Sequence, residues 1–124
     1  MNILIRLSAV ALALTLPAAA FAQNAGDWVL AQWRGGKDWY PGVVQSHVGN
    51  LVAILYDDGT RETLTADHVR RYDWRVGTRV VCRFSNGLWY PARITRMAAD
   101  GATIAVLYDD GDSEVTQTGR CRSQ

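Results

Sequence analysis

The chain contains the stretch WYPGVVQSHVGNLVAILYDDG at residues 39–59 and a second version of it, WYPARITRMAADGATIAVLYDDG, at residues 89–111. Both stretches open with WYP and close with YDDG, and the residues between are mostly apolar or β-branched. An internal repeat of this kind indicates that one structural unit occurs twice. Extending the alignment outward gives two modules, residues 26–72 and residues 77–124.

Each module is expected to be all-β. After residue 22 no segment keeps the 3.6-residue apolar period of a helix, and short β-rich runs alternate with Gly and Asp turn signals. The Asp-Gly pair in each YDDG element is a strong hairpin-turn signal. The predicted strands are residues 28–33, 39–46, 51–56, 61–64 and 69–72, and residues 79–84, 89–96, 103–108, 113–116 and 121–123. Five short strands in a module of this length match an SH3-like barrel.

The two modules are expected to pack against each other or to gain a staple, because a module this small buries too thin a core to be stable alone. The third strand of each module is a nearly continuous apolar run, which predicts that both of its faces are covered. Residues 73–75 alone separate the modules, which is too short a linker for independent tumbling. We therefore expect Trp74 to pack between the barrels.

Residues 1–22 have the pattern of a secretory signal peptide. Arg6 precedes an apolar run at residues 7–16, Pro17 ends that run, and residues 20–22 (AFA) fit the small-x-small cleavage rule. The apolar run is too short to span a bilayer, which needs roughly 20 residues. The sequence therefore predicts an exported protein, periplasmic or secreted, without a stable membrane anchor after cleavage.

The charges balance in the rest of the chain, because removing Arg6 leaves 12 basic and 12 acidic side chains. This balance argues against a general polyanion binder. Arg79, Arg83, Arg93 and Arg96 could still form a basic face on the second module, and nucleic-acid binding through that face is the third function considered. A solvated outer face of alternating strands is the favoured interpretation of these arginines.

Two cysteines in an exported chain predict one disulfide. Cys82 aligns with Ala31 on the first predicted strand of a module, and Cys121 aligns with Val69 on the last. In a small barrel the last strand returns beside the first, so the two positions should be inward-facing neighbours. The alternative is a pair of buried, unpaired thiols. Redox catalysis is not expected, because no Cys-x-x-Cys motif is present.

An enzyme is not expected from this sequence. His47 and His68 occur in the first copy alone, and no serine or cysteine pairing repeats with them. Asp57 and Asp58 are adjacent, so successive positions direct them apart. Neither a metal site nor a cofactor is predicted, because His and Cys clusters and a phosphate-binding glycine loop before a helix are missing from the sequence.

The second module resembles a Tudor domain, on residues 76–81 (VGTRVV), 89–95 (WYPARIT) and 107–111 (LYDDG). The chain after residue 22 resembles a tandem Tudor protein, in a bacterial exported form, and the first copy fits less closely but has every landmark. WYP and YDDG, in order and present twice, make this a fairly specific signal. The resemblance implies two tandem five-stranded SH3-like (Tudor-type) barrels, each with a ligand site at one end, as in proteins that read methylated histone tails.

The resemblance places four residues at each site: an aromatic residue at the end of the first strand, the Tyr of WYP, and the Tyr and second Asp of YDDG. These are Trp33, Tyr40, Tyr56 and Asp58 in the first module, and Phe84, Tyr90, Tyr108 and Asp110 in the second. Aromatic ring faces attract a methylammonium group by about 0.5–2 kcal/mol per contact. A carboxylate pairs with an ammonium that retains a proton.

One position departs from the Tudor pattern. Many family members have a further aromatic residue two positions beyond the second Asp, where this chain has Thr60 and Asp112. Three-sided cages are therefore expected, and the second cage should be the more electronegative. The predicted residues also have a structural interpretation, in which the rings are core residues and the aspartates shape turns.

The favoured function is non-enzymatic binding of a protein or peptide ligand through a cationic or methylated Lys or Arg side chain, without a cofactor. The alternative is a structural or adaptor protein of the cell envelope. In that case the modules bind a protein or cell-wall partner without a working cage.

Overall fold

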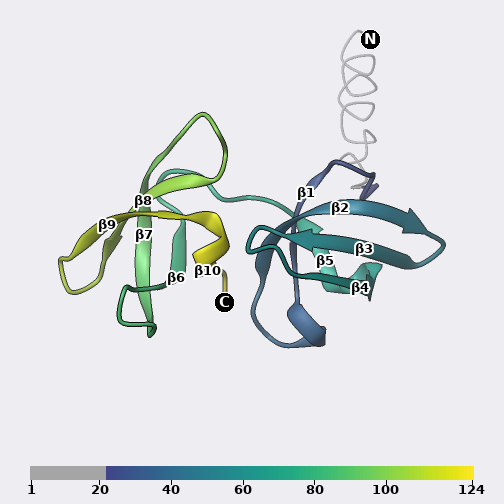
Figure 1. Ribbon diagram of the computed structural model, residues 1–124, viewed down its shortest axis with the longest axis horizontal. Coiled ribbons are helices and arrows are strands. Elements are labelled where there is room, and N and C mark those ends of the chain that lie inside the picture. Colours follow the sequence, from purple (N-terminus) through teal and green to yellow (C-terminus); the bar gives the residue numbers. More distant parts are fainter. Residues whose placement is uncertain (1–21) are drawn as a thin grey trace, which may run out of the picture.

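The computed structural model describes residues 22–124, so the expected signal peptide, apart from its last residue, lies outside the described part (Figure 1). The first module has strands β1 (Trp28–Ala31), β2 (Tyr40–Val48), β3 (Leu51–Tyr56), β4 (Arg61–Thr65) and β5 (Val69–Arg71). The second has β6 (Arg79–Arg83), β7 (Trp89–Met97), β8 (Thr103–Tyr108), β9 (Ser113–Gln117) and β10 (Cys121–Arg122). Short 3₁₀ turns are η1 (Trp33–Gly35), η2 (Ala66–His68) and η3 (Thr118–Arg120). Within these described residues no helix is long and apolar enough to cross a membrane.

Each module forms one five-stranded antiparallel sheet, in the order β4-β3-β2-β1-β5 for the first and β10-β6-β7-β8-β9 for the second. The last strand of each module returns to pair with the first, as expected for a small barrel. Figure 1 shows the two sheets as neighbouring lobes, with β10 near the boundary between them. The all-β prediction, with five strands per module, is confirmed.

The repeated sequence elements produce repeated local structure. Gly59 and Gly111 close the two YDDG turns with φ of 92° and 99°, which glycine adopts without steric cost. The pairing register shifts once in each long second strand, after Val44 in β2 and after Ile94 in β7. Such bulges bend a strand and increase its twist. β1 is shorter than predicted, because the residues that follow Gln32 turn into η1, and β6 ends at Arg83, one residue earlier than predicted, before the turn at residues 85–87.

The modules pack against each other, as predicted, and β1 supplies part of both cores. Its residues alternate across the strand, so that Val29 and Ala31 belong to the first-module core while Leu30 belongs to the second. The prediction that the third strands are covered on both faces was wrong. Leu51 on β3 and Leu107 on β8 remain 53% and 44% exposed, because β1 fills the position between the modules instead.

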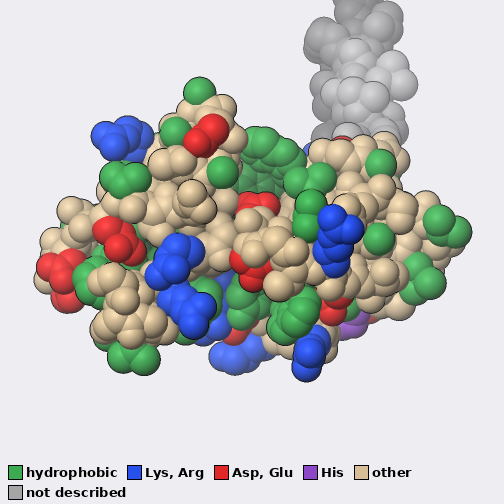
Figure 2. Space-filling model, in the orientation of Figure 1, with side chains coloured by type: hydrophobic (Ala, Val, Ile, Leu, Met, Phe, Trp, Pro, Cys, Tyr) green, Lys and Arg blue, Asp and Glu red, His purple; other side chains and the backbone are tan. Residues whose placement is uncertain are grey.

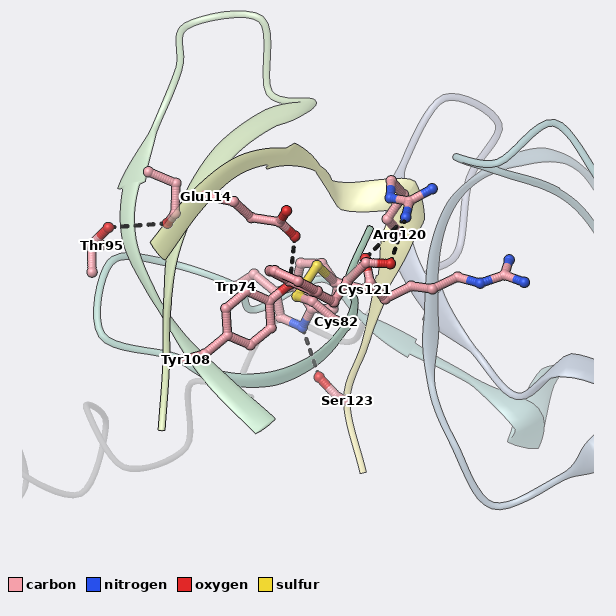
Figure 3. Close-up of a disulfide and its surroundings, with 11 residues drawn as sticks. Trp74, Cys82, Thr95, Tyr108, Glu114, Arg120, Cys121 and Ser123 are labelled. Carbon is pink, nitrogen blue, oxygen red and sulfur yellow. Dashed lines mark hydrogen bonds between the residues drawn. A yellow bond between two sulfur atoms is a disulfide. The ribbon is translucent and has the colours of Figure 1, made fainter. Parts of the chain in front are cut away.

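Trp74 packs between the barrels, as predicted. Its side chain is 5% exposed and lies in the second-module core together with Leu30 of the first module, and its ring centroid is 5.6 Å from that of Tyr72. Figure 3 shows the indole directed toward Ser123, and its Nε1 donates to Ser123 Oγ at 2.7 Å. The backbone of Ser123 in turn exchanges two 2.8 Å hydrogen bonds with Trp39 of the first module. The C-terminal segment thereby joins the two modules.

Cys82 on β6 and Cys121 on β10 form a disulfide, which confirms the predicted pairing. They are register partners and both are fully buried. Figure 3 places the bridge beside Trp74 and Tyr108 in the second-module core. The same register pairs Ala31 with Val69 in the first module, as the repeat alignment predicted.

Candidate functional site

Phe84, Tyr90 and Tyr108 surround an open pocket of about 200 Å³ at one end of the second module, here called the second-module pocket. The Phe84 and Tyr108 ring centroids are 5.4 Å apart with the rings at 88°, and Phe84 and Tyr90 are 6.2 Å apart at 87°. Tyr90 and Tyr108 are 6.3 Å apart at 89°. Three nearly perpendicular rings therefore form the walls of a gap and do not stack on one another.

Two of these rings are held by hydrogen bonds from the edges of the second-module pocket. Tyr108 is 4% exposed and its hydroxyl donates to Glu114 on β9 (Figure 3). Burial, first, and then this bond raise the pKa of Tyr108 well above its ordinary value. Tyr90 is 36% exposed, and its hydroxyl accepts a 2.9 Å bond from Asn86. Tyr108 thus forms the fixed floor and Tyr90 the accessible wall.

The first module has an equivalent cavity of about 260 Å³, the first-module pocket, lined by Trp33, Tyr40, Tyr56 and Asp58. The centroids of Trp33 and Tyr56 are 5.6 Å apart with the rings at 77°. Those of Tyr40 and Tyr56 are 6.4 Å apart at 89°. In both copies, therefore, the YDDG tyrosine meets two further rings of the pocket edge-on.

Glu62 organises the first-module pocket. Tyr56 is 3% exposed and its hydroxyl donates to Glu62 Oε2 at 2.6 Å. The backbone N–H of Arg34 donates to the same oxygen at 3.0 Å, which fixes the η1 turn that carries Trp33. Burial, first, and then the bond from Tyr56 to Glu62 raise the pKa of Tyr56.

The predicted aspartates shape the turns and also line the pockets. Asp58 Oδ1 accepts from the N–H and the hydroxyl of Thr60 at 3.0 and 2.7 Å. Asp110 Oδ1 accepts from the N–H of Asp112 at 3.0 Å. Asp112 itself lines the second-module pocket, which therefore has two carboxylates where the first has one. This difference follows the predicted inequality of the two cages.

The structure brings all eight predicted residues together, four at each pocket. Glu62 and Glu114 were missed, although each follows the YDDG tyrosine by the same spacing in both copies. That shared spacing was the available signal. Gly119 was also missed, because its contribution depends on how the modules pack.

The first-module pocket is completed by the second module. Gly119 on η3 lines it. The hydroxyl of Tyr40 accepts a 3.1 Å bond from Nη1 of Arg122 on β10. The Arg122 guanidinium lies 4.1 Å from the centre of the Trp89 ring, and that ring meets Tyr40 edge-on at 6.4 Å. The second-module pocket is lined by residues of its own module alone.

Replacing Gly119 with alanine is expected to destabilise the contact between the modules. A Cβ at this position would lie 2.9 Å from the carbonyl carbon and oxygen of Asp57 and 3.0 Å from the nitrogen of Asp58. These are backbone atoms that cannot rotate away, and overpacking of this kind costs about 1–3 kcal/mol. Denaturant unfolding measures the loss. The matched control is Asp67→Ala at the equivalent exposed position of η2, and an equal loss there would contradict the prediction.

Arg79, Arg83 and Arg93 of the predicted basic face are engaged within the second module, Arg83 through a 3.3 Å bond from its Nε to the carbonyl of Gly87. Arg79 donates two bonds to Asp109, at 3.1 and 2.8 Å. Arg93 donates to the carbonyl of Gly77 at 2.9 Å. These bonds favour the interpretation of a solvated structural face. Across residues 22–124, no three His, Cys, Asp or Glu side chains gather as metal ligands would.

No protein-family model and no curated protein matches the sequence. Similar solved structures include AGD34 of AGDP1 from Arabidopsis thaliana, which is 18% identical with a TM-score of 0.36 and is matched over 82% of each chain. Another is the tandem Agenet domain 3-4 of ADCP1, which is 16% identical with a TM-score of 0.36, over 82% of this chain and 79% of that one. What the two pockets bind must therefore follow from their own geometry.

Proposed function

We propose that this protein is a non-enzymatic binding module of the Tudor type that captures a cationic or methylated Lys or Arg side chain of a protein or peptide. The observation that carries the proposal is the second-module pocket, in which three nearly perpendicular rings stand beside Asp110. Each ring face attracts an alkylammonium or guanidinium group by about 0.5–2 kcal/mol, depending on desolvation. A nearby carboxylate favours ammonium groups that still carry a proton.

The fixed orientation of the pocket rings supports a ligand-binding role for them over a role in core packing alone. Tyr56 and Tyr108 belong to the cores, yet their hydroxyls are held by Glu62 and Glu114, so the rings keep their orientation when the pocket is empty. Preorganised groups bind with less loss of side-chain entropy. Tyr90 is the most exposed of the cage rings, and core packing does not account for its position.

We also propose that the protein is exported, to the periplasm or outside the cell, after removal of residues 1–22. The Cys82–Cys121 disulfide supports this location, because such bonds persist in oxidising compartments. In that location the ligand is a cationic side chain of an envelope or extracellular protein. No cofactor takes part in this form of binding.

Tyr90→Ala is expected to weaken binding of a dimethyl-lysine or methyl-arginine peptide by about 2- to 30-fold, because it removes one ring face from the second-module pocket. The measurement is an NMR titration that follows the amides around Phe84 and Asp110. Tyr90→Phe is the matched control and should retain most of the affinity, since it keeps the ring. Tyr108 is unsuitable for this test, because removing so buried a ring costs about 3–5 kcal/mol of stability.

Two outcomes would contradict the proposed function. The first is the absence of chemical-shift changes in the wild-type protein with any methylammonium or methyl-arginine peptide at millimolar concentration. The second is binding that Tyr90→Ala and Tyr40→Ala, separately and together, leave unchanged. In either case the envelope adaptor would be the better interpretation.

A further inference from the structure

A third cavity, of about 230 Å³, lies between the two modules and is here called the seam cleft. The first module contributes Trp28, Asp57 and Tyr72, and the second contributes Asp100, Gly101 and Thr118. Figure 2 shows hydrophobic and acidic side chains meeting in the hollow between the lobes. None of these six residues belongs to either aromatic cage.

Contacts between the modules close the seam cleft on two sides. The Trp28 ring reaches across to Gly101, so closely that a Cβ on Gly101 would lie 2.4 Å from it. On the other side, Thr118 Oγ1 donates to Asp57 Oδ2 at 2.6 Å. Trp28 meets Tyr72 edge-on at 5.5 Å and is still 53% exposed. Defined contacts between the modules therefore form the cleft, and the exposed Trp28 ring lies at its edge.

The lining of the seam cleft is acidic and aromatic. Its described residues include two carboxylates, Asp57 and Asp100, and no Lys, Arg or His. Asp100 accepts hydrogen bonds from Ala102 and Thr103 through both of its oxygens, so it contributes mainly charge. Asp57 uses Oδ2 for Thr118, which leaves Oδ1 for a second donor. The lining thus complements a cation that also has a flat or apolar surface.

Elsewhere at the same boundary, an arginine of this chain occupies a comparable environment. The Arg122 guanidinium lies 4.1 Å from the centre of the Trp89 ring, and its Nε is 3.5 Å from Asp38 Oδ2. Arginine suits such sites because its planar group stacks on rings and pairs with carboxylates. The seam cleft offers the same combination of ring and carboxylate without a cation of its own.

The seam cleft adjoins the first-module pocket. Pro41 and Gly119 line both cavities, so one wall is shared from the cage to the cleft. Pro41 opens β2 and Gly119 lies on η3, so each module supplies one of the two residues. Because the two cavities share this wall, a peptide with one side chain in the pocket could place a neighbouring side chain in the cleft.

We propose that the seam cleft binds an arginine or lysine side chain, and that it acts with the first-module pocket on a single peptide. The ligand is then a segment with two cationic residues close together in sequence, one in the cage and one between Trp28 and Asp57. The two-site part of this proposal rests on the proposed function of the cage.

The seam cleft is tested separately from the cage with argininamide as the probe. Titration of the isotope-labelled protein should shift the Trp28 indole N–H and the amides of Gly101 and Thr118, which line the seam cleft and neither aromatic pocket. Asp57→Asn should weaken this binding by about fivefold, because it removes the charge yet keeps an acceptor for Thr118. Asp109→Asn is the matched control at the equivalent position of the second module, and it should change nothing. The absence of seam shifts, or equal effects of the two variants, overturns the proposal.

Two peptides then test the coupling between the seam cleft and the first-module pocket. One carries a single dimethyl-lysine, and the other carries the same residue with an arginine placed next to it or a few residues away. Asp57→Asn should weaken binding of the two-cation peptide alone, and the best spacing should bind several-fold more tightly than the one-cation peptide. Equal weakening of both peptides, or no gain from the arginine, overturns the two-site proposal. Failure of the one-cation peptide counts against the cage, while the argininamide titration still decides the seam.

Discussion

Replacing both Cys82 and Cys121 with alanine is expected to lower the free energy of unfolding by on the order of 4 kcal/mol, and the melting temperature by roughly 15–30 °C. The bond closes a loop with a sequence separation of 39 residues and restricts the unfolded chain accordingly. Both positions are fully buried, so the lost sulfur atoms also leave small cavities. Thermal and denaturant unfolding of the variant and of the oxidised wild type measures the loss, and wild type in reductant should lose a similar amount.

The repeat provides a matched gain-of-function control for the disulfide. Ala31 and Val69 are register partners in the first module, as Cys82 and Cys121 are in the second. The double replacement Ala31→Cys and Val69→Cys should therefore form a second bridge and raise the melting temperature under oxidising conditions. A melting temperature within a few degrees of wild type for the Cys-to-Ala variant would contradict the stabilising role.

Loss of the disulfide is also expected to weaken ligand binding at the first-module pocket. Cys121 begins β10 directly after η3, and these two elements supply Gly119 and Arg122 to the first-module pocket. Without the covalent link to β6, with backbone pairing alone, they would hold Tyr40 and the shared pocket wall less firmly. Ligand affinity at the first-module pocket should therefore fall in the Cys-to-Ala variant, even at a temperature where it remains folded.

The fold was largely predictable because the two copies of the repeat can be aligned with each other. Paired WYP and YDDG elements locate two strands and a turn twice, and alignment of Cys82 with Ala31 and of Cys121 with Val69 placed first and last strands side by side. The same comparison could have identified Glu62 and Glu114. It could not predict the η1 turn, where the first copy contains Trp33-Arg34-Gly35 and the second copy has a shorter loop.

Features at the module boundary were beyond prediction, because they involve residues that differ between the copies. Gly119 corresponds to Asp67 and Leu30 corresponds to Val81, so the repeat gives no signal for either. Leu30 contacts the second-module core only once the modules are docked. The unequal construction of the pockets follows from this docking: the first depends on both modules and the second on one.

Raising the pH above about 10, the ordinary tyrosine pKa, is expected to destabilise the protein steeply. Burial, together with the charges of Asp57 and Asp73, raises the pKa of Tyr72 to about 12. The pKa values of Tyr56 and Tyr108 are raised further, by burial and by their bonds to Glu62 and Glu114. The folded chain therefore keeps phenol protons that the unfolded chain has lost.

The sign of the pH effect follows from these raised pKa values. The stabilisation that the three protonated tyrosines contribute is complete below pH 10, and it is lost as the pH rises toward their folded-state pKa values. While all three tyrosines differ in protonation between the states, the free energy of unfolding falls by up to about 4 kcal/mol per pH unit. Lys37 is the chain's one lysine, and arginine stays charged throughout this pH range. The tyrosines therefore account for most of the change in stability with pH there.

Urea unfolding at a series of pH values, together with the ultraviolet absorbance of phenolate, checks this expectation. Phenolate absorbance from the buried tyrosines should appear as the structure is lost, and not before. Tyr108→Phe should be less stable than wild type at neutral pH by about 0.5–1.5 kcal/mol, because Glu114 loses its donor. Its stability should nevertheless decline more slowly above pH 10, since one titrating group is gone. Parallel declines of the two proteins would contradict the assignment, and a crossing of the two curves would place Tyr108 among the groups that control alkaline unfolding.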